Sequence, residues 1–294
     1  MKHLFIVNPI AGKGKVLPII EKIKEIFSNL DEECIIEVTK RPGHATEIAR
    51  DYVTRDDYRV YSVGGDGTLN EVLNGIVHSK SSLAVIPNGT GNDFIKSICT
   101  EYNMEDILMR TINGKEKFLD LARVNNRYFI NVSSVGFDAE VVYNTVKLKK
   151  HPYVKGTFAY GLGVLLTLFA FNSKKLKIKI DQCIINTSVT LIAVANGKYY
   201  GGGMMIAPKA IINDGILDIC LIRKINKIKL LAFFPRLIKG THEGIKEVSF
   251  YQGNTVHINS NDYISLNIDG EVLKTKEVLF EILHKGIQVV IPRD

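Results

Sequence analysis

Most of the information on the fold lies in the stretch Arg59-Val-Tyr-Ser-Val-Gly-Gly-Asp-Gly-Thr-Leu-Asn-Glu-Val-Leu-Asn74, where a glycine-rich turn joins a short apolar run to a helical pattern. Gly64, Gly65 and Gly67 permit a backbone bend that side chains would obstruct. Where such a turn opens a helix, unpaired amides and the helix dipole favour an anion, above all a phosphate. The stretch therefore predicts a strand, a phosphate-binding turn and a helix.

Asp66 stands in the middle of this turn. A carboxylate repels a neighbouring phosphate unless a cation lies between them or the carboxylate takes part in proton transfer, so Asp66 indicates metal-nucleotide chemistry. The alternative is a plain strand-to-helix turn capped by Asp66 or Thr68. A dinucleotide-binding fingerprint is excluded because Asn70 occupies its third glycine position, and no Gly-Lys-Ser/Thr follows to make a Walker A loop.

Two other predicted strands end in similar loops. The run Leu4–Val7 leads into Asn8-Pro-Ile-Ala-Gly12, and Leu83–Pro87 leads into Asn88-Gly-Thr-Gly-Asn-Asp-Phe94. In open parallel sheets ligands bind outside the carboxyl ends of the strands, so the three loops can converge on one crevice. With a strand over Ile35–Thr39, the pattern predicts an α/β amino-terminal domain with a parallel sheet.

The pattern changes after Gly114, where closely spaced strand patterns follow one another up to Gln288–Ile291. Such spacing favours an antiparallel, β-rich sandwich with a few helices. We place the boundary near Asp120, which gives domains over residues 1–120 and 121–283, with the tail 284–294 completing the first domain. A length of 294 residues suits two domains.

The composition of the chain limits the kinds of partner that we expect it to bind. The net charge of +7 favours an anionic partner, but no aromatic stacking pattern or recognition motif supports nucleic acid. The four cysteines are far apart, so neither a zinc site nor a disulfide framework is indicated. A strand pattern begins at once and leaves no room for a signal peptide, so we expect a cytoplasmic protein.

Two apolar stretches in the second part are flanked by basic residues. Thr157–Phe171 is uncharged for 15 residues, which is short of the ~20 that span a bilayer, so we expect a packed or groove-lining helix. Lys227–Lys239 has a similar character. Together with the lysines beside the first stretch (Lys147, Lys149, Lys150, Lys155, Lys174, Lys175, Lys177 and Lys179), they predict transient, peripheral contact with an anionic membrane during turnover. The alternative is an ordinary solvated face on core helices.

The combination of motifs resembles the diacylglycerol kinase catalytic family, in particular its soluble bacterial lipid kinases, and more distantly the sphingosine and NAD kinases. The motifs are Asn8-Pro-x-Ala-Gly12, Gly64-Gly-Asp-Gly-Thr-Leu-Asn70, Pro87-Asn-Gly-Thr-Gly-Asn-Asp93, Asn213-Asp-Gly215 and Asp269-Gly-Glu271. The resemblance implies an ATP- and Mg²⁺-dependent kinase that phosphorylates a lipid hydroxyl, first of all that of diacylglycerol, giving phosphatidic acid. It also implies an NAD-kinase-like nucleotide domain, a lipid-binding β-rich domain and an active site between them.

The resemblance further assigns residues to ATP and to magnesium. The positions that match ATP-binding positions of the family are Asn8, Pro9, Ile10, Ala11, Gly12, Thr39, Gly64, Gly65, Asp66, Gly67, Thr68, Leu69, Asn70 and Thr90. A structural magnesium site is implied at the backbone carbonyls of Ile211 and Ile216 and the carboxylate of Asp214, since hard cations accept such oxygens. Taken alone, Asn213-Asp-Gly215 is equally a turn between strands.

Glu271 matches the proton acceptor of the family, and a positioned carboxylate can take up the proton of an attacking alcohol. Asp66 is the alternative catalytic residue, or it organises Mg-ATP while Glu271 acts as the base. Without the resemblance, Asp269 and Gly270 would indicate only a hairpin turn. Alternative functions are phosphorylation of phosphatidylglycerol or a sphingoid base, an NAD-kinase-like activity, and nucleotide binding without catalysis. The exact lipid and the oligomeric state, a homodimer included, stay open.

Overall fold

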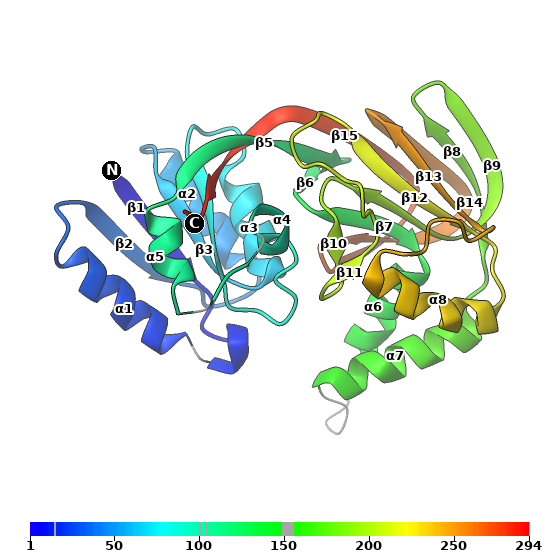
Figure 1. The fold of residues 1–294 in the computed structure, drawn as a ribbon, viewed down its shortest axis with the longest axis horizontal. Helices are drawn as coiled ribbons and strands as arrows, with labels where there is room; N and C mark the ends of the chain where they lie inside the picture. The colour runs from blue at the N-terminus through cyan, green and yellow to red at the C-terminus, as the bar shows by residue number, and fades with distance from the viewer. Residues whose placement is uncertain (15, 100, 104, 149–155, 294) are drawn as a thin grey trace. The chain divides into compact units, whose positions relative to one another are not determined.

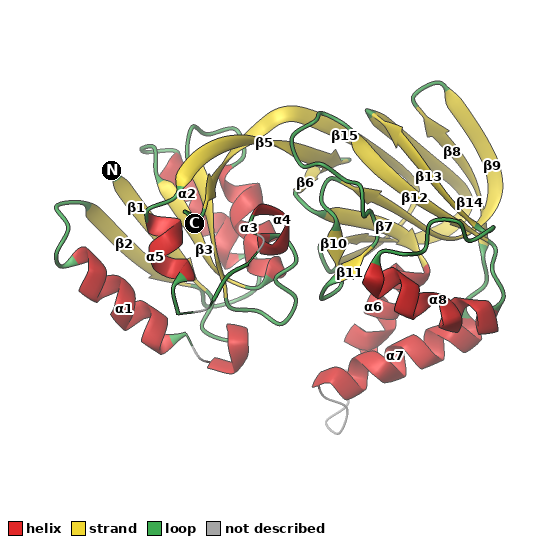
Figure 2. Ribbon diagram, in the orientation of Figure 1, coloured by secondary structure: helices red, strands yellow, loops and turns green. Residues whose placement is uncertain are grey.

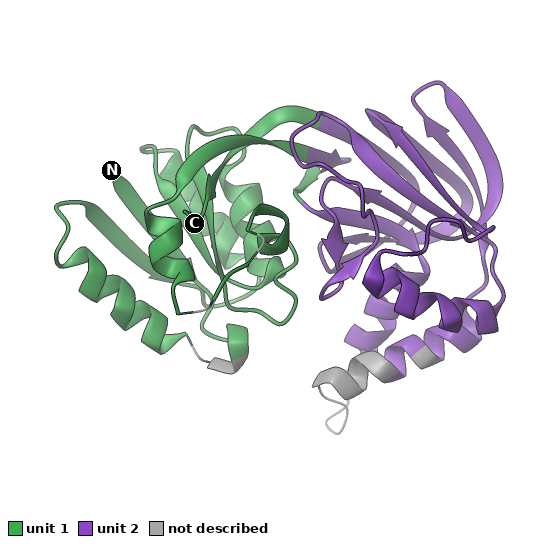
Figure 3. Ribbon diagram, in the orientation of Figure 1, with its two compact units in different colours: residues 1–121, 127–130, 283–294 green, residues 122–126, 131–282 purple. Residues whose placement is uncertain are grey.

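The computed structural model describes residues 1–14, 16–99, 101–103, 105–148 and 156–293 (Figure 1). The chain divides into two compact units (Figure 3). Unit 1 comprises residues 1–121, 127–130 and 283–294, and unit 2 comprises residues 122–126 and 131–282. Of the lysines expected to flank the first apolar stretch, Lys149, Lys150 and Lys155 lie outside the described residues.

Unit 1 is built on a parallel sheet in the order β2-β1-β3-β4, with the end of β15 pairing in parallel with β4 through Val289 and Leu83. Strands β3 and β4 are buried along their whole length, as their apolar runs require of central parallel strands. The strand bounds are β1 Lys2–Val7, β2 Glu33–Val38, β3 Arg59–Gly64, β4 Ser82–Pro87, β5 Lys115–Val124, β6 Arg127–Phe129 and β15 Glu271–Ile291. The predicted α/β fold of the first part is confirmed.

The helices of unit 1 bury an apolar stripe against this sheet. In α1, Ile23 and Phe27 pack in a core that contains Phe5 and Tyr61, because apolar residues recur there at helical spacing. The helix bounds are α1 Leu17–Phe27, α2 His44–Val53, α3 Asp66–Ile76, α4 Ile95–Ile98 and α5 Ile107–Ile112, and a short 3₁₀ helix covers Ala11–Gly14.

Unit 2 is rich in antiparallel strands, as predicted, with the order β13-β12-β9-β7-β14-β15. Strands β7 and β8 each pair with both β9 and β14, so these four strands close into a ring. The bounds are β7 Val132–Gly136, β8 Lys174–Ile180, β9 Cys183–Ala195, β10 Tyr199–Tyr200, β11 Met204–Met205, β12 Leu217–Arg223, β13 Val248–Gly253 and β14 Thr255–Ile268.

Three helices lie along one side of these strands, namely α6 Phe137–Leu148, α7 Gly156–Ala170 and α8 Lys227–Lys239 (Figure 2). Phe137, Leu168 and Leu230 hold them together in one apolar cluster. Among the helices of the described residues, none combines the length and the hydropathy needed to cross a bilayer. The expected helix over the first apolar stretch is present as α7.

Three of the strand patterns expected after Gly114, those that begin at Arg127, Val256 and Ile264, differ from the observed strands. The runs at Val256 and at Ile264 form one strand, β14, whose pairing with β15 shifts register between Asn259 and Ile264. The polar residues between them are absorbed as an irregularity rather than as a loop. The predicted strand from Arg127 is instead interrupted at Asn131, whose carbonyl accepts hydrogen bonds from the Asn196 and Gly197 amides.

Candidate active site

The carboxyl ends of β1, β3 and β4 carry three loops that lie against one another. The Asn8 amide donates a hydrogen bond to the Val63 carbonyl at 3.0 Å, and the Asn8 side-chain Nδ2 donates to Thr68 Oγ1 at 3.0 Å. The Asn88 amide donates to the Gly64 carbonyl at 2.7 Å. Direct hydrogen bonds therefore join the first loop to the second and the second to the third.

Two glycines allow this close approach. A Cβ atom placed on Gly89 would lie 2.4 Å from Gly65 Cα, and one placed on Gly12 would lie 2.5 Å from Asn88 Oδ1. Only glycine lets backbones meet at such distances. Over Gly67, by contrast, a Cβ atom would meet nothing within 4 Å. The expected convergence of the three loops is confirmed, and open space remains above Gly67.

Asp66 begins α3 at the centre of this arrangement. Its Oδ1 accepts a hydrogen bond from the Asp93 amide at 2.8 Å. Burial raises the pKa of Asp66 and the nearby charge of Asp93 raises it further, while the amides of Asn92 and Asp93 and the ammonium of Lys96 oppose the rise. Asp66 is half-buried and Asp93 is buried, with Lys96 Nζ 3.0 Å from Asp93 Oδ1. Two such neighbouring carboxylates favour a cation between them and a phosphate, so the residues fit a magnesium ion.

Asn88 carries an unsatisfied donor at the same place. Its side chain is 7% exposed, and within the described residues its Nδ2 has no hydrogen-bond partner. A buried donor left without a partner costs about 1–3 kcal/mol, which an oxygen of a bound anion would recover. Asn88 therefore fits a phosphate oxygen.

The remaining predicted ATP-binding residues differ in what they can offer. Thr39 lies at the same sheet edge, since its amide donates to the Val7 carbonyl at 2.9 Å. Ile10 and Thr90 are exposed in their loops. Leu69 is buried and its amide donates to the Gly65 carbonyl, so its contribution is to packing.

The Asn70 side chain fixes the position of helix α3. Its Nδ2 donates to the Tyr128 carbonyl at 3.1 Å, and Asn74 Nδ2 donates to the same carbonyl at 2.9 Å. These bonds tie α3 to β6, and with them the start of α3 at Asp66. Pro9, Ala11 and Gly12 complete the first loop and lead into the short 3₁₀ helix.

In unit 2, Glu271 follows a two-residue hairpin. Asp269 and Gly270 both have positive φ angles, 46° and 96°, as a type I′ turn between β14 and β15 requires. The Gly270 amide donates to Asn267 Oδ1 at 2.9 Å, and Glu271 lies exposed at the start of β15. The tight turn thus fixes the backbone from which the Glu271 carboxylate projects.

The predicted magnesium loop precedes β12. Asp214 is exposed, and its Oδ1 accepts a hydrogen bond from the Ile216 amide at 3.1 Å. Asn254 Nδ2 donates a hydrogen bond to the Gly215 carbonyl at 2.9 Å. Across the described ranges no three His, Cys, Asp or Glu side chains gather, so a cation here needs carbonyl and water oxygens as well. The predicted ligands, the Asp214 carboxylate and the backbone carbonyls of Ile211 and Ile216, include such carbonyl oxygens.

Comparison with known proteins decides the family. The diacylglycerol kinase catalytic domain matches residues 2–124, and the YegS C-terminal NAD kinase beta sandwich-like domain matches residues 131–291, more than half of the chain. The chain belongs to the diacylglycerol kinase family of lipid kinases. It is 29% identical to the diacylglycerol kinase of Bacillus subtilis (strain 168), over 98% of this chain and 96% of that protein.

Other relatives of this lipid kinase agree. A protein of Shewanella frigidimarina named "Probable lipid kinase YegS-like" is 34% identical over 80% of this chain and 76% of its own length. A crystal structure from Bacillus anthracis str. Sterne, described as a candidate diacylglycerol kinase, is 27% identical, with a TM-score of 0.81 over 99% of this chain and 95% of that one. The predicted family, fold class and ATP-dependent lipid kinase activity are confirmed.

Two residues of the candidate site, Asp93 and Asn88, are missing from the site residues that the sequence predicts. An acid at position 93 is equally a helix cap, and Asn88 stands in the third motif without an assigned role. A signal was present for both, since they lie at the two ends of the third glycine loop. Their importance follows from their neighbours, Asp66 and Gly12, which are distant in sequence.

Proposed function

We propose that this lipid kinase transfers the γ-phosphate of Mg-ATP to the free hydroxyl of diacylglycerol and so forms phosphatidic acid. The observation that carries the proposal is the meeting of three glycine loops around Asp66, with the Asn88 donor unsatisfied beside it. Diacylglycerol is favoured because the Bacillus subtilis relative, which aligns over nearly the whole chain, is named for it.

In this proposal the loops of unit 1 hold the triphosphate. Asn88 Nδ2 and the hydroxyl of Thr90 donate hydrogen bonds to phosphate oxygens, and the open space over Gly67 admits the phosphates. Asp66 and Asp93 hold the magnesium ion. Bound there, Mg²⁺ would neutralise charge on the phosphates.

Glu271 acts as the general base. The oxygen of the lipid hydroxyl forms a bond to the γ-phosphorus as the bond from that phosphorus to the β–γ bridging oxygen breaks. The proton of the hydroxyl passes to the Glu271 carboxylate, and ADP leaves with the bridging oxygen.

We also propose that the enzyme works from the cytoplasm and touches an anionic membrane through α7 and α8. Phe169 is 69% exposed and Ile228 is 82% exposed, and Lys227 Nζ donates to the Phe169 carbonyl between them. Exposed apolar side chains beside lysines suit an anionic bilayer surface, where each cation contributes about 1 kcal/mol.

A radiolabelled-ATP assay tests the substrate. Purified enzyme with Mg²⁺ and mixed micelles of diacylglycerol should yield labelled phosphatidic acid, identified by its mass. Micelles of phosphatidylglycerol and of a sphingoid base run in parallel. Label in either of these lipids and none in diacylglycerol would reject the proposed substrate while retaining a lipid kinase.

The same preparation tests membrane contact. The double variant Phe169→Glu/Ile228→Glu should sediment less with anionic vesicles than the wild type, whereas Leu30→Glu, an exposed apolar position of unit 1, should sediment normally. Equal sedimentation of all three proteins would remove the assignment of this surface to the membrane.

The loop at Asp214 predicts a cation-dependent stability. Binding of Mg²⁺ to the folded protein alone should raise the melting temperature by a few degrees, since a ligand at 100 times its Kd adds about 2.7 kcal/mol. Asp214→Ala should lose most of this rise, and Asp262→Ala, another exposed acid of unit 2, should keep it. An unchanged rise in Asp214→Ala would place the cation elsewhere.

A further inference from the structure

Lys96, in the short helix α4, folds back onto the third glycine loop, residues 88–94. Its Nζ donates hydrogen bonds to the Gly91 carbonyl at 2.8 Å and to Asp93 Oδ1 at 3.0 Å. Only 6% of the Asp93 side chain and 30% of the Lys96 side chain are exposed. Hydrogen bonds from a charged donor that is largely shielded from water are stronger than bonds between neutral groups, so Lys96 holds both of these oxygens.

Other oxygens of the loop are engaged by the protein as well. The Gly89 carbonyl accepts a hydrogen bond from Asn92 Nδ2 at 3.0 Å, and Asn92 Oδ1 accepts one from the Gly89 amide at 2.9 Å. Asp66 Oδ1 accepts the amide of Asp93 at 2.8 Å. Together with the two oxygens that accept from Lys96, one oxygen of each carboxylate and two loop carbonyls are therefore engaged.

Mg²⁺ and Ca²⁺ differ in their need for such oxygens. Ca²⁺ takes about six to eight oxygens at about 2.3–2.6 Å, often both oxygens of one carboxylate and backbone carbonyls. Mg²⁺ takes about six at about 2.0–2.1 Å, keeps several waters, and binds one or two carboxylates together with substrate phosphates. An ammonium already bonded to an oxygen also repels a second cation there. The loop therefore suits Mg²⁺ and opposes Ca²⁺.

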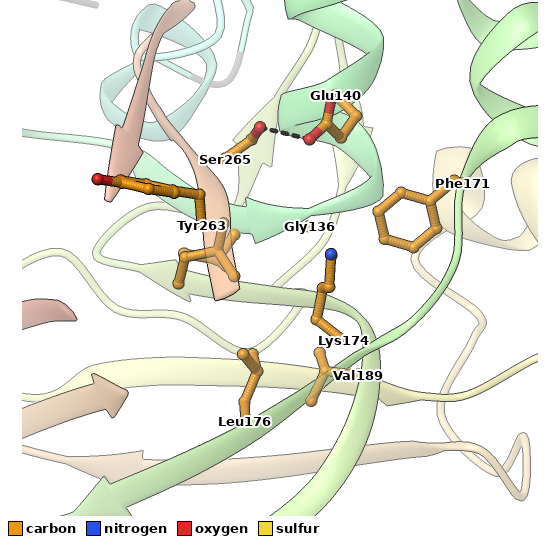
Figure 4. Close-up of a pocket in the computed structure, with 10 residues that line it drawn as sticks. Gly136, Glu140, Phe171, Lys174, Leu176, Val189, Tyr263 and Ser265 are labelled. Carbon is orange, nitrogen blue, oxygen red and sulfur yellow. Dashed lines mark hydrogen bonds between the residues drawn. The ribbon is translucent and has the colours of Figure 1, made fainter. Parts of the chain in front are cut away.

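A lysine–carboxylate pair of unit 2 has a different role. Glu140 Oε1 accepts a hydrogen bond from the Ser265 hydroxyl at 2.6 Å (Figure 4) and also pairs with Lys274, so it joins α6 to β14 and β15. Among the described residues that line this pocket, Glu140 is the only acid. Lys96 instead pairs with an acid three residues before it, so its contacts shape the loop itself.

We propose that Lys96 determines which divalent cation accompanies ATP. By holding Asp93 Oδ1 and the Gly91 carbonyl, it denies Ca²⁺ oxygens that this ion needs and favours Mg²⁺. Lys96 acts through these two groups, so it is a specificity-determining residue and not a catalytic one. The inference rests on the proposed function, since it concerns the cation that Asp66 and Asp93 are proposed to hold.

Calorimetric titration of ATP without lipid, in MgCl₂ or in CaCl₂, tests this role apart from catalysis. The wild type should bind Mg-ATP more tightly than Ca-ATP. In Lys96→Met the ratio of the two affinities should fall about tenfold, because Ca²⁺ gains the second Asp93 oxygen and the Gly91 carbonyl. Loss of a positive charge near the phosphates weakens both complexes alike and cancels from the ratio. An unchanged ratio in folded Lys96→Met would overturn the proposal.

Two variants serve as matched controls. Lys96→Arg should keep the wild-type ratio, since a guanidinium can donate to both oxygens. Lys24→Met, from an exposed pair with Glu21 on α1, should keep it too. Circular dichroism and melting curves check that each variant is folded. A ratio in Lys96→Arg as low as in Lys96→Met would overturn the hydrogen bonds as the cause of the preference.

The outcomes separate this role from the proposed function. A lowered ratio in Lys96→Met of an enzyme that phosphorylates no diacylglycerol would retain the cation preference and reject the substrate assignment. Phosphorylation of diacylglycerol by the wild type, with an unchanged ratio in Lys96→Met, would retain the function and reject the role of Lys96.

Discussion

Replacing Glu271 by Gln is expected to lower turnover by about 10²–10⁴-fold while ATP binds as tightly as before. Gln has nearly the shape of Glu but cannot take up the proton of the lipid hydroxyl. Glu271 lies in unit 2, whereas the loops proposed to hold the triphosphate are all in unit 1. Nucleotide affinity, measured by calorimetry with Mg-ATP, should therefore be unaffected as kcat falls.

Glu277→Gln is the matched control, because Glu277 is an exposed acid of the same strand, β15. It should retain the turnover of the wild type. Full turnover in Glu271→Gln would transfer the role of base to another group, with Asp66 the first to examine. A parallel loss of ATP affinity would show that Glu271 contributes to nucleotide binding.

Asp66→Asn should reverse the nucleotide preference of the enzyme as well as lower turnover by about 10²-fold or more. In the proposed mechanism Asp66 repels a bare triphosphate and binds it through a cation. Removing its charge should therefore weaken the binding of Mg-ATP and strengthen the binding of magnesium-free ATP. The Asn oxygen can still accept the Asp93 amide, which keeps the loop connected. Titrations with Mg²⁺ and with a chelator measure the two affinities.

Asp51→Asn, on an exposed face of α2, controls for the change in net charge. It should bind both nucleotide forms as the wild type does. If Asp66→Asn lost affinity for ATP equally with and without magnesium, Asp66 would be a structural residue of the loop rather than the partner of a cation.

The sequence predicted the convergence of the loops because its signals are local. Gly65 and Gly89 each follow a buried parallel strand, and such strands present their carboxyl ends at one edge. The same reasoning placed Asp66 at the centre. It could not show that Asp93 donates its amide to Asp66, since that contact depends on how two loops fold against each other.

The burial of Asp138 in α6, which raises its pKa to about 6, could not be predicted for a similar reason. The stretch after β7 gave no strong helical pattern, and α6 was not predicted. The residues that surround Asp138 come from helices α6, α7 and α8 and from strands β9 to β12, spread from Phe137 to Leu237. The burial of this carboxylate depends on how these helices and strands pack together. The residues next to Asp138 in the sequence do not indicate it.

Strand β15 has a consequence for how such kinases can be recombined. Its first part pairs with β14 in unit 2, and its last part pairs with β4 in unit 1. A single crossover near residue 130 would leave one parent's β4 to accept a strand from the other. A chimera of two relatives therefore needs two crossover points, the second close to Leu283, so that each unit comes whole from one parent. A gene divided at a single point would not encode the two units separately.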